Sequence, residues 1–114
     1  MNVAHPSVIK FNGSLKDLSS LIHSHDGLTV LDIDASWCPC CRRISKMLPI
    51  FAKEHPDVQI IRVDGDINPE IKTYFGVEHI PSLKFIKSNK HLDPIDTIVG
   101  VDIPLIKEKL LLHR

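Results

Sequence analysis

The chain has 114 residues, and its 14 basic and 14 acidic side chains give a formal net charge of zero at pH 7. This length suits one domain, spanning residues 1–114, that buries its own core without disulfide staples. The balanced charge and the lack of a basic stripe argue against nucleic acid as a partner, because neutralising phosphates needs clustered cations. The N-terminus lacks the apolar region of a secretory signal, and no apolar run approaches the roughly 18 residues of a membrane span. We expect a soluble, cytoplasmic protein that contacts no membrane and acts as a monomer.

The pattern of apolar residues predicts an α/β fold with the element order β-α-β-α-β-α-β-β-α. In chain order, the sequence predicts a strand at 7–11, a helix from 14 to a stop at 27, a strand at 28–35, a helix at 39–55, a strand at 58–64, a helix at 68–75, strands at 82–88 and 96–101, and a last helix from 102 onward. This order implies a central mixed sheet flanked by helices, with parallel strands first and an antiparallel hairpin late.

Particular residues mark the expected ends of the helices. Ser14 followed by Asp17 resembles a capping box at the start of the first helix. Asn68 before Pro69 is expected to be an N-cap, with proline at the first helical position of the third helix. Pro49 lacks an N–H group inside the second helix, so we expect a kink there.

Three cysteines fall within four positions in the segment SWCPCCRR, residues 36–43, where a strand leads into a helix. Cys38 and Cys41 lie three residues apart on one helical face, close enough to form a reversible disulfide. The helix N-terminus favours the thiolate of Cys38, which predicts that Cys38 is the nucleophile and Cys41 the resolving thiol. Asp32, on the preceding strand, is the expected buried acceptor of the Cys41 proton.

Other uses of the cysteine cluster explain the pattern less well. A lone C-x-x-C is half of a zinc knuckle, but the second half is missing, so we predict no metal site. Inert buried thiols would not need three cysteines beside a tryptophan at one turn. Cys40 is expected to point outward, either as a bystander or as a second partner for another thiol.

With these residues in place, the chain resembles the thioredoxin family over nearly its whole length. Residues 37–41 are similar to the family motif W-C-x-x-C, Asp32 is similar to its buried acid, and residues 80–83 (Ile-Pro-Ser-Leu) are similar to the family segment with a cis proline. The resemblance implies the thioredoxin fold and a shallow apolar docking surface, where the backbone beside the dithiol pairs with an extended substrate. The residues expected to rim this surface are Trp37, Ile80, Pro81 and Gly100.

The chain also departs from the family pattern. Pro39 and Cys40 replace the usual Gly-Pro between the two cysteines, a dipeptide that tunes the reduction potential. Asp34 stands where the family commonly has a large aromatic residue. Because Asp34 lies on the same strand face as Asp32, we expect the two carboxyl groups to couple in titration. The alternative that Asp34 lies at a solvated strand end fits the pattern equally well. Arg62 aligns with a family lysine near the buried acid.

The resemblance implies a protein disulfide oxidoreductase that acts through Cys38 and Cys41 with no bound cofactor. Electrons would come from NADPH through a flavoprotein similar to thioredoxin reductase, and the substrates would be oxidised proteins such as peroxiredoxins. Three alternatives stay open: a glutathione-coupled oxidoreductase similar to glutaredoxin, a non-catalytic module that binds a partner through the groove at Pro81, and a metal carrier.

Overall fold

The computed structural model describes residues 8–87 and 91–114, and within them the elements follow the predicted order. In chain order they are β1 (Ile9–Phe11), α1 (Leu15–Ser24), β2 (Leu28–Asp34), α2 (Pro39–Glu54), β3 (Gln59–Asp64), α3 (Pro69–Tyr74), β4 (Ser82–Lys87), β5 (Asp96–Val99) and α4 (Ile103–His113). The outer ends of the strands predicted at 7–11 and 82–88 lie outside the described residues.

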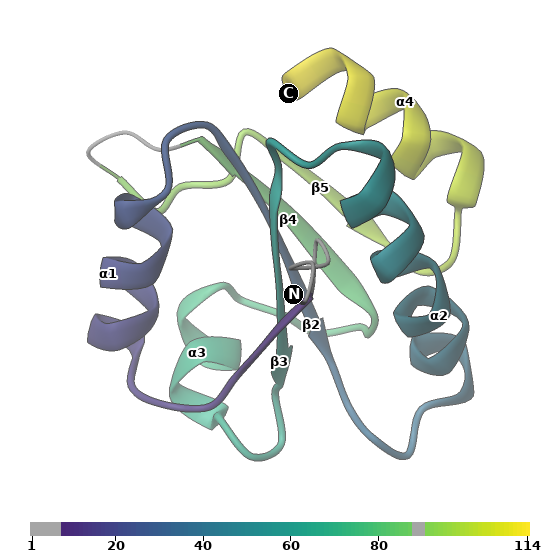
Figure 1. Ribbon diagram of the computed structural model, residues 1–114. Coiled ribbons are helices and arrows are strands. Elements are labelled where there is room, and N and C mark those ends of the chain that lie inside the picture. The colour runs from purple at the N-terminus through teal and green to yellow at the C-terminus, as the bar shows by residue number, and fades with distance from the viewer. Residues whose placement is uncertain (1–7, 88–90) are drawn as a thin grey trace, which may run out of the picture.

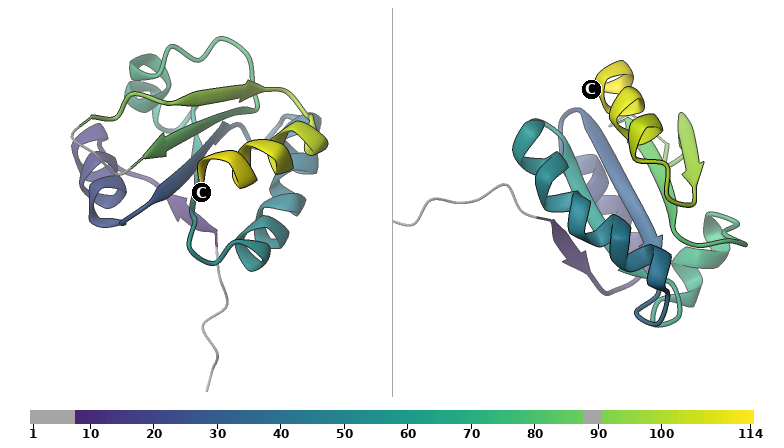
Figure 2. Two further views of the ribbon diagram at one scale, coloured as in Figure 1. Left: turned by 90° about the horizontal axis from the view of Figure 1, so that it is seen from above. Right: turned by 90° about the vertical axis from the view of Figure 1, so that its right-hand side faces the viewer.

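The strands form a mixed sheet in the order β1-β3-β2-β4-β5. β1 and β2 both pair in parallel with β3, whereas β4 is antiparallel to β2 and β5 is antiparallel to β4. Helices α1 and α3 lie on one face of the sheet and α2 and α4 on the other (Figure 1), and the side view shows α2 and α4 next to each other across their face (Figure 2). The predicted mixed sheet with a late antiparallel hairpin is therefore confirmed.

Each face of the sheet has its own apolar core. The face under α2 and α4 buries thirteen residues, namely Leu28, Val30, Ile44, Leu48, Phe51, Ala52, Val58, Ile60, Leu83, Phe85, Ile98, Ile106 and Leu110. The face under α1 and α3 buries Leu18, Ile22, Leu31, Ile33, Ile61, Val63, Ile71, Val77, Ile86 and Leu92. Alternate residues of β2 enter both cores, because successive side chains of a strand point to opposite faces. This central strand is thus held from both sides up to the point where it meets the cysteines.

The central strand β2 is buried on both of its faces. Every residue from Leu28 to Asp34 is buried. Asp32 and Asp34 continue the row of Leu28 and Val30 beneath α2, because side chains two apart share a face and helices cover both faces of the sheet. The two carboxyl groups therefore lie in the interior.

The predicted N-cap positions Ser14 and Asn68 are confirmed, but of the two only Ser14 caps its helix with its side chain. The Ser14 hydroxyl accepts a hydrogen bond from the Asp17 amide at 3.0 Å, and the Asp102 carboxylate caps α4. Asn68 precedes α3 but makes no side-chain cap hydrogen bond. Its side-chain oxygen instead accepts a hydrogen bond from the Gly13 amide, and its side-chain nitrogen donates to Asn12 and to the Asp64 carbonyl at the end of β3. The amide thus makes three hydrogen bonds, whereas a helix cap would use only its oxygen.

Helix α2 runs from Pro39 to Glu54 with Pro49 inside it. A kink at Pro49 stays a prediction. Among the described helices, none is long and apolar enough to cross a membrane.

Candidate active site

The turn between β2 and α2 places Cys38 at the N-cap of the helix. Pro39 takes the first helical position, where its missing N–H costs nothing and its fixed φ suits the helix. The Cys38 amide donates to the carbonyl of Ala35 at 3.2 Å, and the Cys38 sulfur accepts a hydrogen bond from the Cys41 amide at 3.3 Å. The sulfur thus occupies the place of a capping oxygen, where a thiolate meets unpaired amides and the positive end of the helix dipole.

The three thiols differ sharply in their surroundings. Cys38 is 6 % exposed and Cys41 is 1 % exposed, and both pack in a small cluster with Ala35. Cys40 is exposed, as predicted, and all three thiols are free. Burial raises the pKa of the Cys41 thiol to about 12, and the hydrogen bond with Cys38 acts in the same direction. Cys41 is therefore a thiol that needs a base before it can attack a disulfide.

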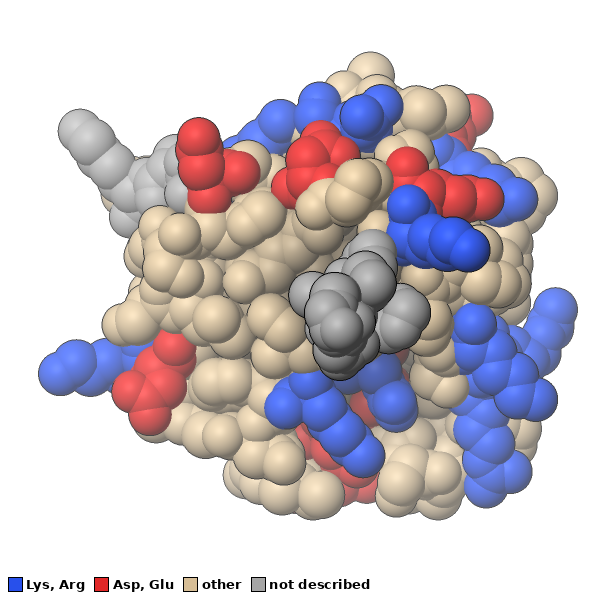
Figure 3. Space-filling model, viewed as in Figure 1, with Lys and Arg blue, Asp and Glu red and all other residues tan. Residues whose placement is uncertain are grey.

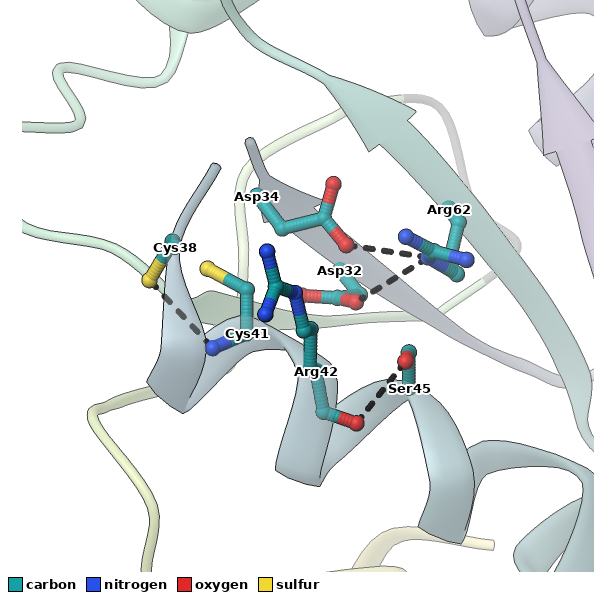
Figure 4. Close-up of polar contacts among 7 residues, drawn as sticks. All are labelled: Asp32, Asp34, Cys38, Cys41, Arg42, Ser45 and Arg62. Carbon is teal, nitrogen blue, oxygen red and sulfur yellow. Dashed lines mark hydrogen bonds and ion pairs between the residues drawn. The ribbon is translucent and has the colours of Figure 1, made fainter. Parts of the chain in front are cut away.

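Asp32 and Asp34, which the sequence predicts on one face of the strand before the dithiol, lie close together in the structure. Asp32 and Asp34 project from β2 toward α2, on the side of the sheet where Cys41 lies (Figure 4). Asp32 is completely buried. Burial first, and repulsion from Asp34 second, raise the pKa of Asp32 well above the usual range, while Arg62 opposes the shift. The predicted coupling between the two carboxyl groups is present.

Arg62 on β3 binds the two carboxyl groups unequally. Its Nε lies 2.9 Å from Asp34 Oδ2, in a hydrogen-bonded ion pair, and 3.8 Å from Asp32 Oδ2. The parallel register that sets Asp32 opposite Arg62 brings these residues to one face. Asp34 is 2 % exposed, so the alternative of a solvated strand end was wrong, because the paired guanidinium compensates the buried charge.

The residues expected to rim the docking surface lie near the thiols but differ in exposure. Ile80 packs against the cluster of Ala35, Cys38 and Cys41, and the Ile80–Pro81 peptide bond is cis, as the resemblance implied. Pro81 itself is buried, and its carbonyl accepts a hydrogen bond from the amide of the half-buried Gly100 at 2.9 Å. This hydrogen bond ties Gly100 to the segment that carries Ile80.

Trp37 is 63 % exposed beside the thiols, and its orientation depends on a residue that sequence reasoning missed. Its indole Nε1 donates a hydrogen bond to Asp66 Oδ2 at 2.7 Å. Asp66 follows β3, and the β3 end is tied to the β2 end by the bond from the Gly65 amide to the Asp34 carbonyl. Nothing in the local sequence indicated this contact, because it joins two loops through the pairing of β2 with β3.

The α2 side of the site is basic. Arg42 and Arg43 directly follow Cys41 and are exposed, as are Lys46 and Lys53 further along the helix. Lys and Arg side chains gather over α2 in the space-filling view, whereas acidic and basic groups are interspersed elsewhere on that face (Figure 3).

Within residues 8–87 and 91–114, no group of three His, Cys, Asp or Glu side chains could hold a metal ion.

Two free thiols three residues apart at the start of one helix, with a buried carboxyl group on the preceding strand, meet the requirements of reversible dithiol–disulfide exchange. The class of protein defined by this fold and site is a thiol–disulfide exchange protein. The sequence profile of thioredoxin matches residues 10–106, which is most of the chain. The chain belongs to the thioredoxin family, and it is a thiol–disulfide oxidoreductase.

Individual relatives agree with this assignment. The chain is 37 % identical over 100 residues to a thioredoxin of Geodia cydonium, covering 88 % of this chain and 87 % of the relative. It is 36 % identical over 86 residues to thioredoxin H5 of Arabidopsis thaliana, covering 75 % and 70 %. The solved structure of Trichomonas vaginalis thioredoxin matches with a TM-score of 0.89 at 34 % identity, over 96 % of this chain and 98 % of that one. Thioredoxins need no bound cofactor for disulfide exchange and work with a reductase and disulfide substrates.

Proposed function

We propose that the chain reduces protein disulfides, with Cys38 as the nucleophile. The observation that carries this assignment is the hydrogen bond from the Cys41 amide to the Cys38 sulfur at the helix N-cap, which stabilises a thiolate at that position. The Cys38 thiolate attacks one sulfur of the target disulfide. That S–S bond breaks, a mixed disulfide forms, and the second target sulfur leaves as a thiolate that takes a proton from water.

Cys41 completes the exchange in a second step. Its thiol loses a proton to Asp32, and the resulting thiolate attacks the Cys38 sulfur. The mixed disulfide breaks, the first target sulfur leaves as a thiolate, and a Cys38–Cys41 disulfide forms, so two electrons have passed to the target. The raised pKa of Cys41 supports this order, because Cys41 stays protonated and inert until a base is available beside it.

The substrate would lie over the surface formed by Trp37, Ile80 and Gly100. The contact of Ile80 with the cysteine cluster supports this position, since its backbone then lies beside the sulfur that is attacked. An extended segment of the target would pair with that backbone in the manner of strand addition. The exposed indole of Trp37 would supply apolar contact area next to the disulfide.

Electrons would return to the dithiol from NADPH through a flavoprotein similar to thioredoxin reductase, and peroxiredoxins are among the expected acceptors. We place this exchange in the cytoplasm, because only a reducing compartment keeps the dithiol in the form that donates electrons.

Reduction of insulin disulfides by dithiothreitol tests the proposal with three matched variants. Cys38→Ser should abolish the acceleration, Cys41→Ser should leave a trapped mixed disulfide with insulin at Cys38, and Cys40→Ser should retain activity. The Cys40 variant is the control, because it removes an equivalent sulfur from the same helix turn. Activity in Cys38→Ser would overturn the assignment. Reduction of the oxidised protein by glutathione alone would favour the glutaredoxin-like alternative, and inactivity of the native folded chain would favour a binding module.

A further inference from the structure

The buried base of the proposed mechanism has no visible way to exchange its proton. Asp32 has no exposed surface, and among the described residues none donates a hydrogen bond to either of its carboxyl oxygens. A carboxyl group that accepts the Cys41 proton in every turnover must lose that proton before the next one. The proton therefore has to pass through a neighbouring group that reaches water.

Asp34 is the neighbouring group in the right position. It shares the strand face of Asp32, and its Oδ2 and the Oδ2 of Asp32 lie 2.9 Å and 3.8 Å from the same Arg62 Nε. Asp34 also lines an open cleft of about 230 Å³, together with Arg62, Ser36 and Asp64. Asp34 thus has Asp32 on one side and a space large enough for several water molecules on the other.

We propose that Asp34 carries protons between the buried Asp32 and the water of this cleft, and that Arg62 holds the two carboxyl groups in position for the transfer. The inference rests on the proposed function of Asp32 as the base for Cys41. The Cys41 proton moves to Asp32, then to the Asp34 carboxylate, and then to water in the cleft. No electrons move in these steps, and each carboxyl group returns to its starting state.

The charges around the pair explain why Asp32 needs a proton acceptor close to it. Burial and the Asp34 charge favour the protonated form of Asp32, so the proton does not leave Asp32 for bulk solvent without an acceptor nearby. The other titratable and charged groups around the carboxyl pair and the cleft are Lys10 of β1, Arg62 and Asp64 of β3, Cys38 at the N-cap of α2 and Cys41 within α2. Asp34 itself shares Arg62 with Asp32 and also lines the cleft.

The test separates the two chemical steps in Asp34→Asn, with Asp34→Glu as the conservative variant. Stopped-flow mixing of the reduced protein with insulin measures target release by Cys41, and the same variants in a Cys41→Ser background measure mixed-disulfide formation alone. We expect Asp34→Asn to leave the first step unchanged and to slow release about tenfold at pH 7, less than the loss of a general base itself. Added imidazole, a small proton carrier that can enter the cleft, should restore the rate, and Asp34→Glu should release at nearly the native rate.

A role of Asp34 limited to its charge makes the opposite prediction. Removing that charge would make Asp32 easier to ionise, so release near pH 7 would become faster and imidazole would have no effect. Faster or unchanged release, or slow release that imidazole does not restore, overturns the proposal. If Asp34→Asn does not fold by circular dichroism, Asp34→Ser is measured by the same criteria. Failure of the proposed function is distinguishable, because it would show as activity in Cys38→Ser with the native Asp34 in place.

Discussion

Replacing Asp32 with asparagine should change how the stability of the protein depends on pH. The folded state raises the pKa of Asp32 well above the value of an unfolded aspartate, about 3.9, so the folded protein binds a proton that the unfolded chain has released. Stability from this group is fully present below the unfolded pKa and is lost as pH rises through the folded pKa. One proton corresponds to a slope of up to about 1.4 kcal/mol per pH unit in the free energy of unfolding.

Urea denaturation at pH 5, 6, 7 and 8, followed by far-ultraviolet circular dichroism, measures this slope in the native chain and in Asp32→Asn. Most of this pH range lies below the pKa of an ordinary thiol, about 8.5, so ionisation of Cys41 in the unfolded chain contributes little to the slope. The native chain should lose stability relative to the variant as pH rises, because asparagine has no proton to lose. The seven histidines contribute equally to both proteins and cancel in the difference. Stability curves that run parallel over this range would refute the argument that burial raises the pKa of Asp32.

Three other substitutions test the fold. Phe51→Ala, in the core under α2 and α4, should lower the free energy of unfolding in urea by about 3–5 kcal/mol, because a fully buried aromatic ring leaves a cavity. Asn68→Ala should cost about 1–3 kcal/mol in the same measurement, since its buried amide joins β3 to the loop after β1; a loss no larger than that of an exposed control such as Ser20→Ala would contradict this role. Asp96→Asn should destabilise the protein at pH 7 but not in acid, because hydrogen bonds first from His113 and then from Lys109 lower the pKa of Asp96. The stabilisation by the Asp96 carboxylate is lost as pH falls through this lowered pKa. The same stability difference at pH 3 and at pH 7 in an acid titration of unfolding would exclude this role.

The order of elements and the identity of the dithiol could be predicted from local signals. Ser14 and Asp17 mark a helix start by the chemistry of two side chains three residues apart, and the structure keeps that hydrogen bond. Cys38 and Cys41 are brought together by helical spacing alone, so no distant contact is needed to pair them. The cis bond before Pro81 was implied by family resemblance, since one proline within a strand-like segment would not by itself indicate it.

Contacts between residues far apart in the chain could not be predicted from the sequence. Asn68 looked like a helix cap, but its amide is used by residues about 55 positions earlier in the chain. Trp37 is oriented by Asp66, and no pattern near either residue indicates that the two meet. In both contacts the partners are joined by the pairing of β3 with its neighbours, which the local sequence does not specify.

The sequence alone determined the succession of strands and helices and the placement of the Cys38 sulfur at a helix start, with Cys41 one turn later. Each of these features depends on residues within a few positions of one another. The environment of the acid behind them was decided only by the tertiary structure. Whether Asp32 and Asp34 face water or protein depends on which helix covers that face of β2 and on Arg62 reaching them from β3. Burial and electrostatic pairing are properties of the assembled sheet, so they emerge only when segments far apart in the chain come into contact.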